Sequence, residues 1–154
     1  MTVTIRTAAS SDAETIAGFN AAMALETESL QLDRARLLEG VRAVLADSSK
    51  GFYVIADLSG VVVGQMMVTF EWSDWRNGVF WWIQSVYVRQ ESRRQGVFQA
   101  LYHHVEAQAR AAGGVCGLRL YVERHNKRAQ STYQNLGMKE TDYLVYEVDF
   151  VLRR

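Results

Sequence analysis

The residues best suited to bind a ligand lie where a strand-like run gives way to a helical one. Residues 85–88 read Ser-Val-Tyr-Val and are followed by polar residues 89–95 and then by Gly96, after which a helix is predicted. The start of a helix exposes unpaired backbone N–H groups and the positive end of the helix dipole. Because Arg93 and Arg94 add positive charge, the turn could bind the phosphates of a cofactor.

A second interpretation of this turn is purely structural. Gly96 can ease the change of direction, and the neighbouring arginines can be solvated charges, since short glycine motifs often match by chance. Two common nucleotide-binding patterns, Gly-x-x-x-x-Gly-Lys and Gly-x-Gly-x-x-Gly, are absent. The residues of the turn alone leave both interpretations open.

Other reactive side chains give little sign of a second site. His103 and His104 are adjacent in a predicted helix, where neighbouring residues point about 100° apart and cannot face one ligand together. Cys116 lies in an apolar strand-like run with no Cys or His at metal-binding spacing, so a buried thiol is expected there. No metal site is predicted.

Length and composition indicate one domain covering residues 1–154, because 154 residues with 49% hydrophobic content suffice for one substantial core. The 17 basic and 17 acidic side chains cancel, which argues against nucleic acid or an anionic membrane as a partner. With one cysteine, no signal-peptide pattern and no apolar run near the length of a membrane span, a cytoplasmic protein is expected.

The order of elements follows from hydrophobic spacing and turn residues. A strand is expected at residues 3–6, and Ser11 and Glu14 have capping-box spacing for a first helix. Asp33 is a suitable N-cap for a second helix that ends before Gly51. Three strands at residues 52–56, 61–71 and 79–88 are separated by turn signals and predict an antiparallel meander.

The second half alternates helix and strand. A helix is expected from Gly96 to Gly113-Gly114, a strand at 115–122, a helix capped by Asn126 and ended by Gly137, and a last strand at 143–151. The predicted fold is therefore α/β, with a mixed, mostly antiparallel sheet of about six or seven strands and helices on both faces.

At this point the sequence resembles the GNAT superfamily of N-acetyltransferases. That family binds a pyrophosphate with Arg/Gln-x-x-Gly-x-Gly/Ala after a strand that ends in a Val-type position, and Arg93, Gly96 and Val88 match this pattern. The last small position is occupied by Phe98, which is a departure from the family's motif. The resemblance extends over nearly the whole chain, up to residues 126–129, Tyr133 and residues 136–138.

The resemblance implies acetyl-CoA as co-substrate. The backbone of Val86 and Val88 would pair with the pantetheine arm, and Asn126 would contact the cofactor near its thioester end. The pyrophosphate would meet the loop of Arg93, Arg94, Gln95, Gly96, Val97, Phe98 and Gln99. For Asn126, a helix N-cap explains the asparagine without any ligand.

The resemblance also places Tyr133 where the family has the tyrosine that protonates the departing CoA thiolate. A phenol with a pKa near 10 can hold that proton at neutral pH. The alternative is that Tyr133 is a core aromatic in the same helical stripe as Ala129 and Leu136. Some family members have a glutamate base where this chain has Trp82, so no general base is assigned.

Four carboxylates are candidates for the acceptor site. Glu26 and Glu28 end the first predicted helix, and Glu71 and Asp74 flank Trp72 in the hairpin. A surface carboxylate is the default interpretation of each. Their common sign nevertheless favours a cationic acceptor.

The predicted activity is acetyl transfer from acetyl-CoA to a primary amine, on a small molecule or a peptide, by direct attack in a ternary complex. Two alternatives remain open. Phe98 and the missing strand carboxylate are compatible with a non-catalytic acyl-CoA sensor, and the tryptophans of the hairpin with an interaction protein that has a vestigial cofactor loop. The same tryptophans could pack a homodimer.

Overall fold

The computed structural model describes residues 2–152, which fall into two compact units, one up to Tyr121 and one from Val122. The first unit contains β1 (Val3–Thr7), η1 (Ser10–Asp12), α1 (Ala13–Glu28), α2 (Arg34–Ala46), β2 (Phe52–Leu58), β3 (Val61–Ser73), β4 (Gly78–Val88), η2 (Gln90–Ser92), α3 (Val97–Ala111) and β5 (Val115–Leu120). The second unit contains α4 (Lys127–Asn135).

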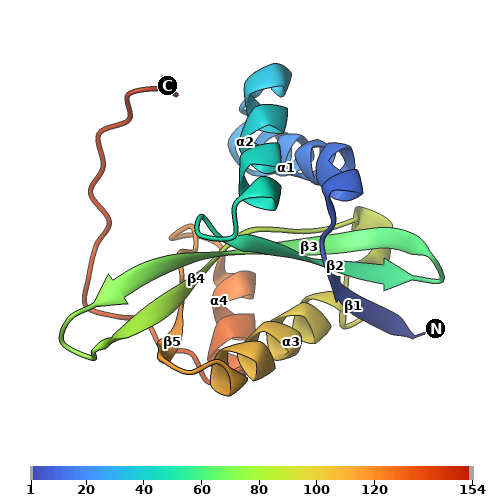
Figure 1. Cartoon of the computed structure of the whole chain (residues 1–154). Helices are drawn as coiled ribbons and strands as arrows, with labels where there is room; N and C mark the ends of the chain where they lie inside the picture. The colour runs from blue at the N-terminus through green and yellow to red at the C-terminus, as the bar shows by residue number, and fades with distance from the viewer. Residues whose placement is uncertain (1, 153–154) are drawn as a thin grey trace. The chain divides into compact units, whose positions relative to one another are not determined.

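The first unit is built on one five-stranded sheet in the order β1-β2-β3-β4-β5. β1 to β4 pair antiparallel, and β5 pairs parallel with β4 after the crossover through α3. Helices α1 and α2 cover one face and α3 the other (Figure 1). The mixed, mostly antiparallel α/β fold with helices on both faces is confirmed, with five strands rather than six or seven.

The missing strand is the one expected near the C-terminus. Residues 143–151 form no strand in the structure, although their sequence is rich in β-branched and aromatic residues. Their large side chains are exposed, with Tyr146 at 89% and Phe150 at 87% relative exposure. Strand character in a sequence is not sufficient, because a strand forms only against a partner that satisfies its backbone groups.

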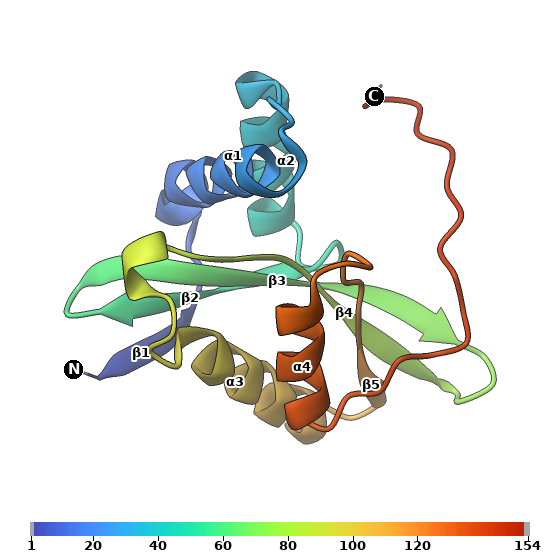
Figure 2. The same ribbon diagram turned by 180° about the vertical axis from the view of Figure 1, so that it is seen from behind.

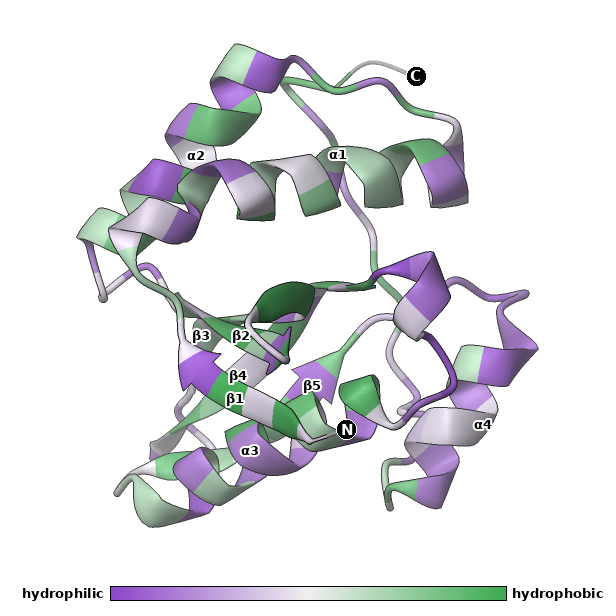
Figure 3. Cartoon of the chain, turned by 90° about the vertical axis from the view of Figure 1, so that its right-hand side faces the viewer, coloured by the Kyte–Doolittle hydropathy of each residue, from purple (hydrophilic) through white to green (hydrophobic). Residues whose placement is uncertain are grey.

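Alternation along the central strands divides the core between the two faces. Tyr53 and Ile55 of β2 pack in one buried cluster with Ile16 of α1 and Val41 of α2. Val54 lies between them in sequence and is also fully buried, so it belongs to the opposite face, which α3 covers. Figure 3 shows long hydrophobic stretches on the strands and a hydrophilic segment between β4 and α3.

The helix caps were predicted with one error. Asp33 accepts hydrogen bonds from the amides of Ala35 and Arg36, at 3.0 and 3.1 Å, and caps α2 as expected. The capping box between Ser11 and Glu14 is wrong. α1 begins one residue later, at Ala13, and a short 3-10 turn that contains Ser11 leads into it.

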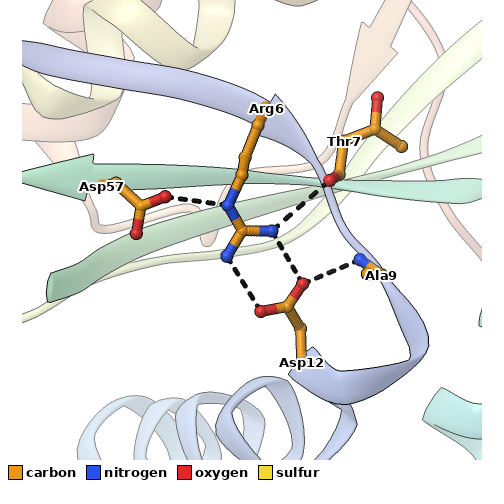
Figure 4. Close-up of polar contacts among 5 residues, drawn as sticks. All are labelled: Arg6, Thr7, Ala9, Asp12 and Asp57. Atoms are coloured by element: carbon orange, nitrogen blue, oxygen red, sulfur yellow. Dashed lines mark hydrogen bonds and ion pairs between the residues drawn. The ribbon is translucent and has the colours of Figure 1, made fainter. Parts of the chain in front are cut away.

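The cause of that difference is an ion-pair cluster at the start of α1 (Figure 4). Arg6 donates from Nη1 and Nη2 to both carboxylate oxygens of Asp12, at 2.8 and 2.9 Å, and from Nε to Asp57 at 2.8 Å. Asp12 also accepts the amide of Ala9 at 2.7 Å. The Arg6 hydrogen bonds hold the pKa of Asp12 below its usual range, so Asp12 is the ionised residue that organises this turn.

Candidate active site

β4 extends beyond the end of its neighbour β5. Their pairing ends at Ile83 and Leu120, whereas β4 continues to Val88. Beyond Ile83, no strand of the described sheet lies on that side of β4. The end of β4 therefore has one edge paired with β3 and one edge open.

A β-bulge decides which backbone groups reach the open edge. Gln65 lies opposite Tyr87 and Met67 opposite Gln84, so two β4 residues, Ser85 and Val86, share one position of β3. Ser85 has a positive φ of 48°. The bulge inserts one extra residue, which reverses the alternation of β4 from that point onward.

Two hydrogen bonds verify the reversal. Before the bulge, the amide of Val79 bonds to the carbonyl of Gly114, on the β5 side, at 2.8 Å. After it, the amide of Arg89, also an odd-numbered residue, bonds to the carbonyl of Val63 in β3 at 2.8 Å. Since antiparallel neighbours alternate, the backbone groups of Val86 and Val88 are directed to the open edge.

The chain then turns into α3 at the same end of the sheet (Figure 2). Arg94 and Gly96 both have positive φ, 66° and 81°, and Gly96 is the N-cap residue of α3. The first intrahelical bond runs from the amide of Ala100 to the carbonyl of Gly96 at 3.0 Å. The amides of Val97, Phe98 and Gln99 lie in the first turn of α3, ahead of this first intrahelical bond.

Space around this turn suits an approaching ligand. A Cβ built on Gly96 would have no heavy atom within 4 Å, so the side facing outward is unobstructed. Phe98 lies half-buried on the first turn of α3 with its ring 6.3 Å from that of Tyr102, one turn along the helix. The departure from the family's motif thus adds an aromatic side chain that packs along α3.

Arg93 has a defined position on the α1 side of the loop. Its Nη2 lies 3.0 Å from Oε2 of Glu26, and its Nε donates to the carbonyl of Val88 at 2.7 Å. Glu26 also accepts from Tyr87 Oη at 3.1 Å and from Gln90 Nε2 at 3.0 Å. The hydrogen bond from Arg93 is the main reason that the pKa of Glu26 lies below its usual range.

An open groove with a volume of about 480 Å³ lies between α1 and the chain that follows β4. Its lining carries both charge signs and two aromatic rings and consists of Thr15, Gly18, Phe19, Ala22, Glu26, Tyr87, Arg89, Gln90 and Glu91. The guanidinium of Arg89 lies 5.1 Å from the centre of the Phe19 ring. Both aromatic rings of the groove therefore already stack with arginines of the protein, since Arg93 lies over Tyr87 in the same way, and the carboxylates of Glu26 and Glu91 are the groups that suit a cationic ligand.

The four candidate acceptor carboxylates do not form one site. Glu26 contacts Tyr87, whereas Glu71 lies opposite Phe80 in β4 and forms an ion pair with Arg119 at 2.6 Å. Phe80 and Tyr87 are seven residues apart, which corresponds to roughly 20 Å along a strand. Asp74 lies still farther away, in the turn after β3, while Glu28 ends α1 beside Glu26.

The four tryptophans also separate into two pairs. Trp72 and Trp75 are 64% and 83% exposed in the hairpin, whereas Trp81 is buried and packs edge-on against Phe52 at 5.2 Å. Trp82 is half-buried and lies 4.8 Å from the ring of Tyr121. The hairpin pair is the more exposed of the two.

In the second unit, Asn126 caps α4 by accepting the amide of Ala129 at 3.1 Å. Gly137 follows the helix with a φ of 92°, as predicted for its C-terminal stop. Tyr133 lies on α4 and is half-buried, and burial raises the pKa of its phenol. The phenol therefore remains protonated throughout the neutral range.

The contacts of three residues in this region are not predicted by the sequence. Tyr87 and Gln90 bind Glu26, and Gln65 contacts the bulge from β3. Nothing in the spacing of these residues signals their contacts, which join segments 20 to 64 positions apart. Among residues 2–152, no three His, Cys, Asp or Glu side chains are grouped to hold a metal ion.

The chain belongs to the acetyltransferase (GNAT) family, whose sequence profile matches residues 17–138. It is an acetyl-CoA-dependent acetyltransferase of that family. No curated protein sequence matches the chain. Within the part that the structure describes, none of the helices has the length and apolar character to cross a bilayer.

Solved structures agree with this assignment. A possible acetyltransferase from Clostridium difficile 630 is 45% identical, with a TM-score of 0.89 over 99% of this chain and 100% of that one. A predicted acetyltransferase from Clostridium acetobutylicum, solved with acetyl-CoA, is 15% identical, with a TM-score of 0.78 and 97% of each chain covered. AAC(6')-Iy with a CoA-S-monomethyl-acetylneamine bisubstrate analogue is 18% identical, with a TM-score of 0.78 over 97% and 99% of the chains. The last two comparisons show the fold alone.

Proposed function

We propose that this acetyltransferase transfers the acetyl group of acetyl-CoA to a primary amine of a small cationic acceptor, by direct attack in a ternary complex. The observation that best supports this proposal is that two surfaces suited to the cofactor follow one another along the chain. The open edge of β4 at Val86 and Val88 leads within eight residues to the exposed helix start at Gly96. We propose that residues 1–154 form one catalytic domain, working in the cytoplasm.

The residues present fit acetyl-CoA in two ways. The pantetheine arm contains two amides in an extended chain, which can hydrogen-bond to the backbone of Val86 and Val88 as an added strand would. The diphosphate matches the backbone amides of Val97, Phe98 and Gln99 in the first turn of α3 and the positive end of the α3 dipole. Arg94 and Gln95 precede them, with Arg94 contributing charge.

In this proposal, Arg93 supports the loop rather than contacting the phosphates with its whole guanidinium. Its Nε and Nη2 are occupied by Val88 and Glu26. Asn126 and Tyr133 act from α4: Asn126 near the thioester end, and Tyr133 as the group that returns a proton to the thiolate. The raised pKa of Tyr133 supports this role, because the phenol stays protonated until the thiolate leaves.

For the acceptor, the structure favours the Glu26 end of β4 over the hairpin. Glu26 is ionised, lines the groove and contacts Tyr87, which lies between the two β4 residues assigned to the pantetheine arm. Glu28 ends the same helix. Glu71 and Asp74 are too far along β4 to contact an amine that attacks near Val86.

A screen of amines tests the proposal. The purified chain would be incubated with acetyl-CoA and a panel of polyamines, amino sugars, amino acids and peptides, and free CoA thiol would be followed. Turnover with one or more small cations is expected, and Glu26→Gln should raise KM for that acceptor more than KM for acetyl-CoA. Turnover with peptides alone would overturn the small-molecule assignment.

An interaction role is the second candidate, and one observation favours it. Trp72 near the end of β3 and Trp75 in the turn after it expose two large aromatic side chains, which are common at protein interfaces. A homodimer through this turn would be detected by sedimentation at several concentrations. Trp75→Ser should then produce a monomer with unchanged turnover. Acetyl-CoA binding without CoA release for any amine would instead favour the sensor function.

A further inference from the structure

The bulge in β4 is held by a polar group that the proposed catalytic steps do not use. Gln65 of β3 is fully buried, and its Nε2 donates to the carbonyl of Ser85 at 3.0 Å. The same Nε2 donates to Oδ1 of Asn20 in α1 at 2.7 Å. Gln65 therefore links Ser85, the bulge residue of β4, to Asn20 of α1.

Burying Gln65 lowers the stability of the fold, so stability does not explain why a glutamine is present here. A buried glutamine loses its hydration, and Oε1 of Gln65 has no hydrogen-bond partner among the described residues. A leucine or methionine of similar volume at this position would avoid both costs. Buried polar groups with an unsatisfied atom are characteristic of positions kept for a purpose other than packing.

Ser85 needs the support that Gln65 supplies. It is a non-glycine residue with a φ of 48°, in the left-handed region that side chains rarely adopt. A relaxed β4 without the bulge would restore regular alternation, and the amides of Val86 and Val88 would then turn toward β3. The conformation of Ser85 thus decides whether those amides reach the open edge.

We propose that Gln65, anchored by Asn20, is a positioning residue that holds Ser85 in its left-handed conformation and so presents the amides of Val86 and Val88 to acetyl-CoA. The inference rests on the proposed function of those two amides. Gln65 touches neither co-substrate in this scheme. Its effect passes through the backbone of β4.

The test combines a loss and a rescue. Gln65→Leu keeps the volume and removes both hydrogen bonds, and kcat/KM for acetyl-CoA should fall between about 10- and 100-fold, as expected for a misplaced contact. Gln65→Leu with Ser85→Gly should recover most of the loss, because glycine adopts positive φ without support. A general packing defect would not respond to a glycine 20 positions away.

Two further variants keep the result interpretable. Ile55 of β2 lies opposite Gln65 and is fully buried. The substitution Ile55→Val therefore controls for disturbance of the same core, and it should leave kcat/KM unchanged. Ser85→Val leaves Gln65 in place but strains the bulge directly, and should reproduce the loss even if Gln65→Leu folds poorly.

The outcomes separate the two proposals. A crystal structure of Gln65→Leu should show Ser85 outside the left-handed region, and an unchanged Ser85 would overturn the positioning role whatever the activity. Unchanged kcat/KM in both Gln65→Leu and Ser85→Val would also overturn it. A wild-type chain that neither binds acetyl-CoA nor releases CoA would instead overturn the assigned function of the amides.

Discussion

Glu26 and Arg93 are 67 positions apart in sequence, and Oε2 of the former lies 3.0 Å from Nη2 of the latter. The contact joins the C-terminal end of α1 to the loop that leads into α3. The guanidinium also lies over the ring of Tyr87, 5.3 Å from its centre. The cofactor loop is thereby fastened to the helix that lines the groove.

Disrupting this contact should loosen the loop. We expect Arg93→Gln to weaken acetyl-CoA binding several-fold in calorimetry, because the loop loses its bonds to both Glu26 and Val88. In a double-mutant cycle with Glu26→Gln, the coupling should be below about 1 kcal/mol and should shrink in high salt, since both side chains are partly exposed. A coupling that salt does not change would contradict the ion-pair interpretation.

Charge at the start of α3 should control cofactor affinity. Gly96→Glu is expected to abolish detectable acetyl-CoA binding, because a carboxylate there opposes both the helix dipole and the diphosphate. Gly96→Gln is the matched control, since it imposes the same backbone strain at a φ of 81° without the charge. Equal affinities for the two variants would show that the diphosphate does not bind at this turn.

Tyr133 should affect turnover rather than binding. Tyr133→Phe is expected to lower kcat by about 100-fold or more, in the range for loss of a general acid, with KM for acetyl-CoA within about twofold. Tyr143→Phe, at an exposed tyrosine of the same unit, should leave both constants unchanged. Because burial raises the pKa of Tyr133, the wild-type rate should fall only as the pH rises above about 10. A full rate in Tyr133→Phe would assign the proton to another group.

Stability should depend on pH through Asp12. The Arg6 hydrogen bonds lower the pKa of the folded carboxyl, so its stabilising contribution is present above about pH 4 and is lost as the pH falls through the folded pKa. Asp12→Asn should cost about 1–3 kcal/mol near neutral pH, as expected for charge-assisted hydrogen bonds. Thermal melts should show this difference shrinking toward pH 3. A difference independent of pH would exclude ionisation of Asp12 as its cause.

Much of the fold was predictable because local chemistry and tertiary structure agree. Asp33 and Asn126 cap the helices for which they were suggested, and the Asn77-Gly78 turn joins β3 to β4. The turn at Gly96 was also predicted, since only a few residue types suit a positive φ before a helix. These features depend on residues near one another in sequence.

The features that were predicted wrongly or missed depend instead on residues far apart in sequence. Asp12 accepts hydrogen bonds from Arg6 and from the amide of Ala9, and α1 therefore begins after the predicted capping box. The bulge at Ser85 depends on Gln65 and Asn20, and serine carries no signal for it. Residues 143–151 have strand composition but form no strand. Each case depends on a distant partner, or on the lack of one, which a sequence pattern does not reveal.

The odd residue in β4 also has a consequence for how the gene tolerates change. Under the proposed mode of binding, the cofactor is read by backbone groups, so most point substitutions at Val86 or Val88 leave the recognised atoms in place. Insertion or deletion of one codon between Ile83 and Val86 would reverse the phase of the strand and turn both recognised amides, those of Val86 and Val88, toward β3. This site is therefore robust to substitutions and vulnerable to frame-preserving insertions and deletions, the reverse of a site built from side chains.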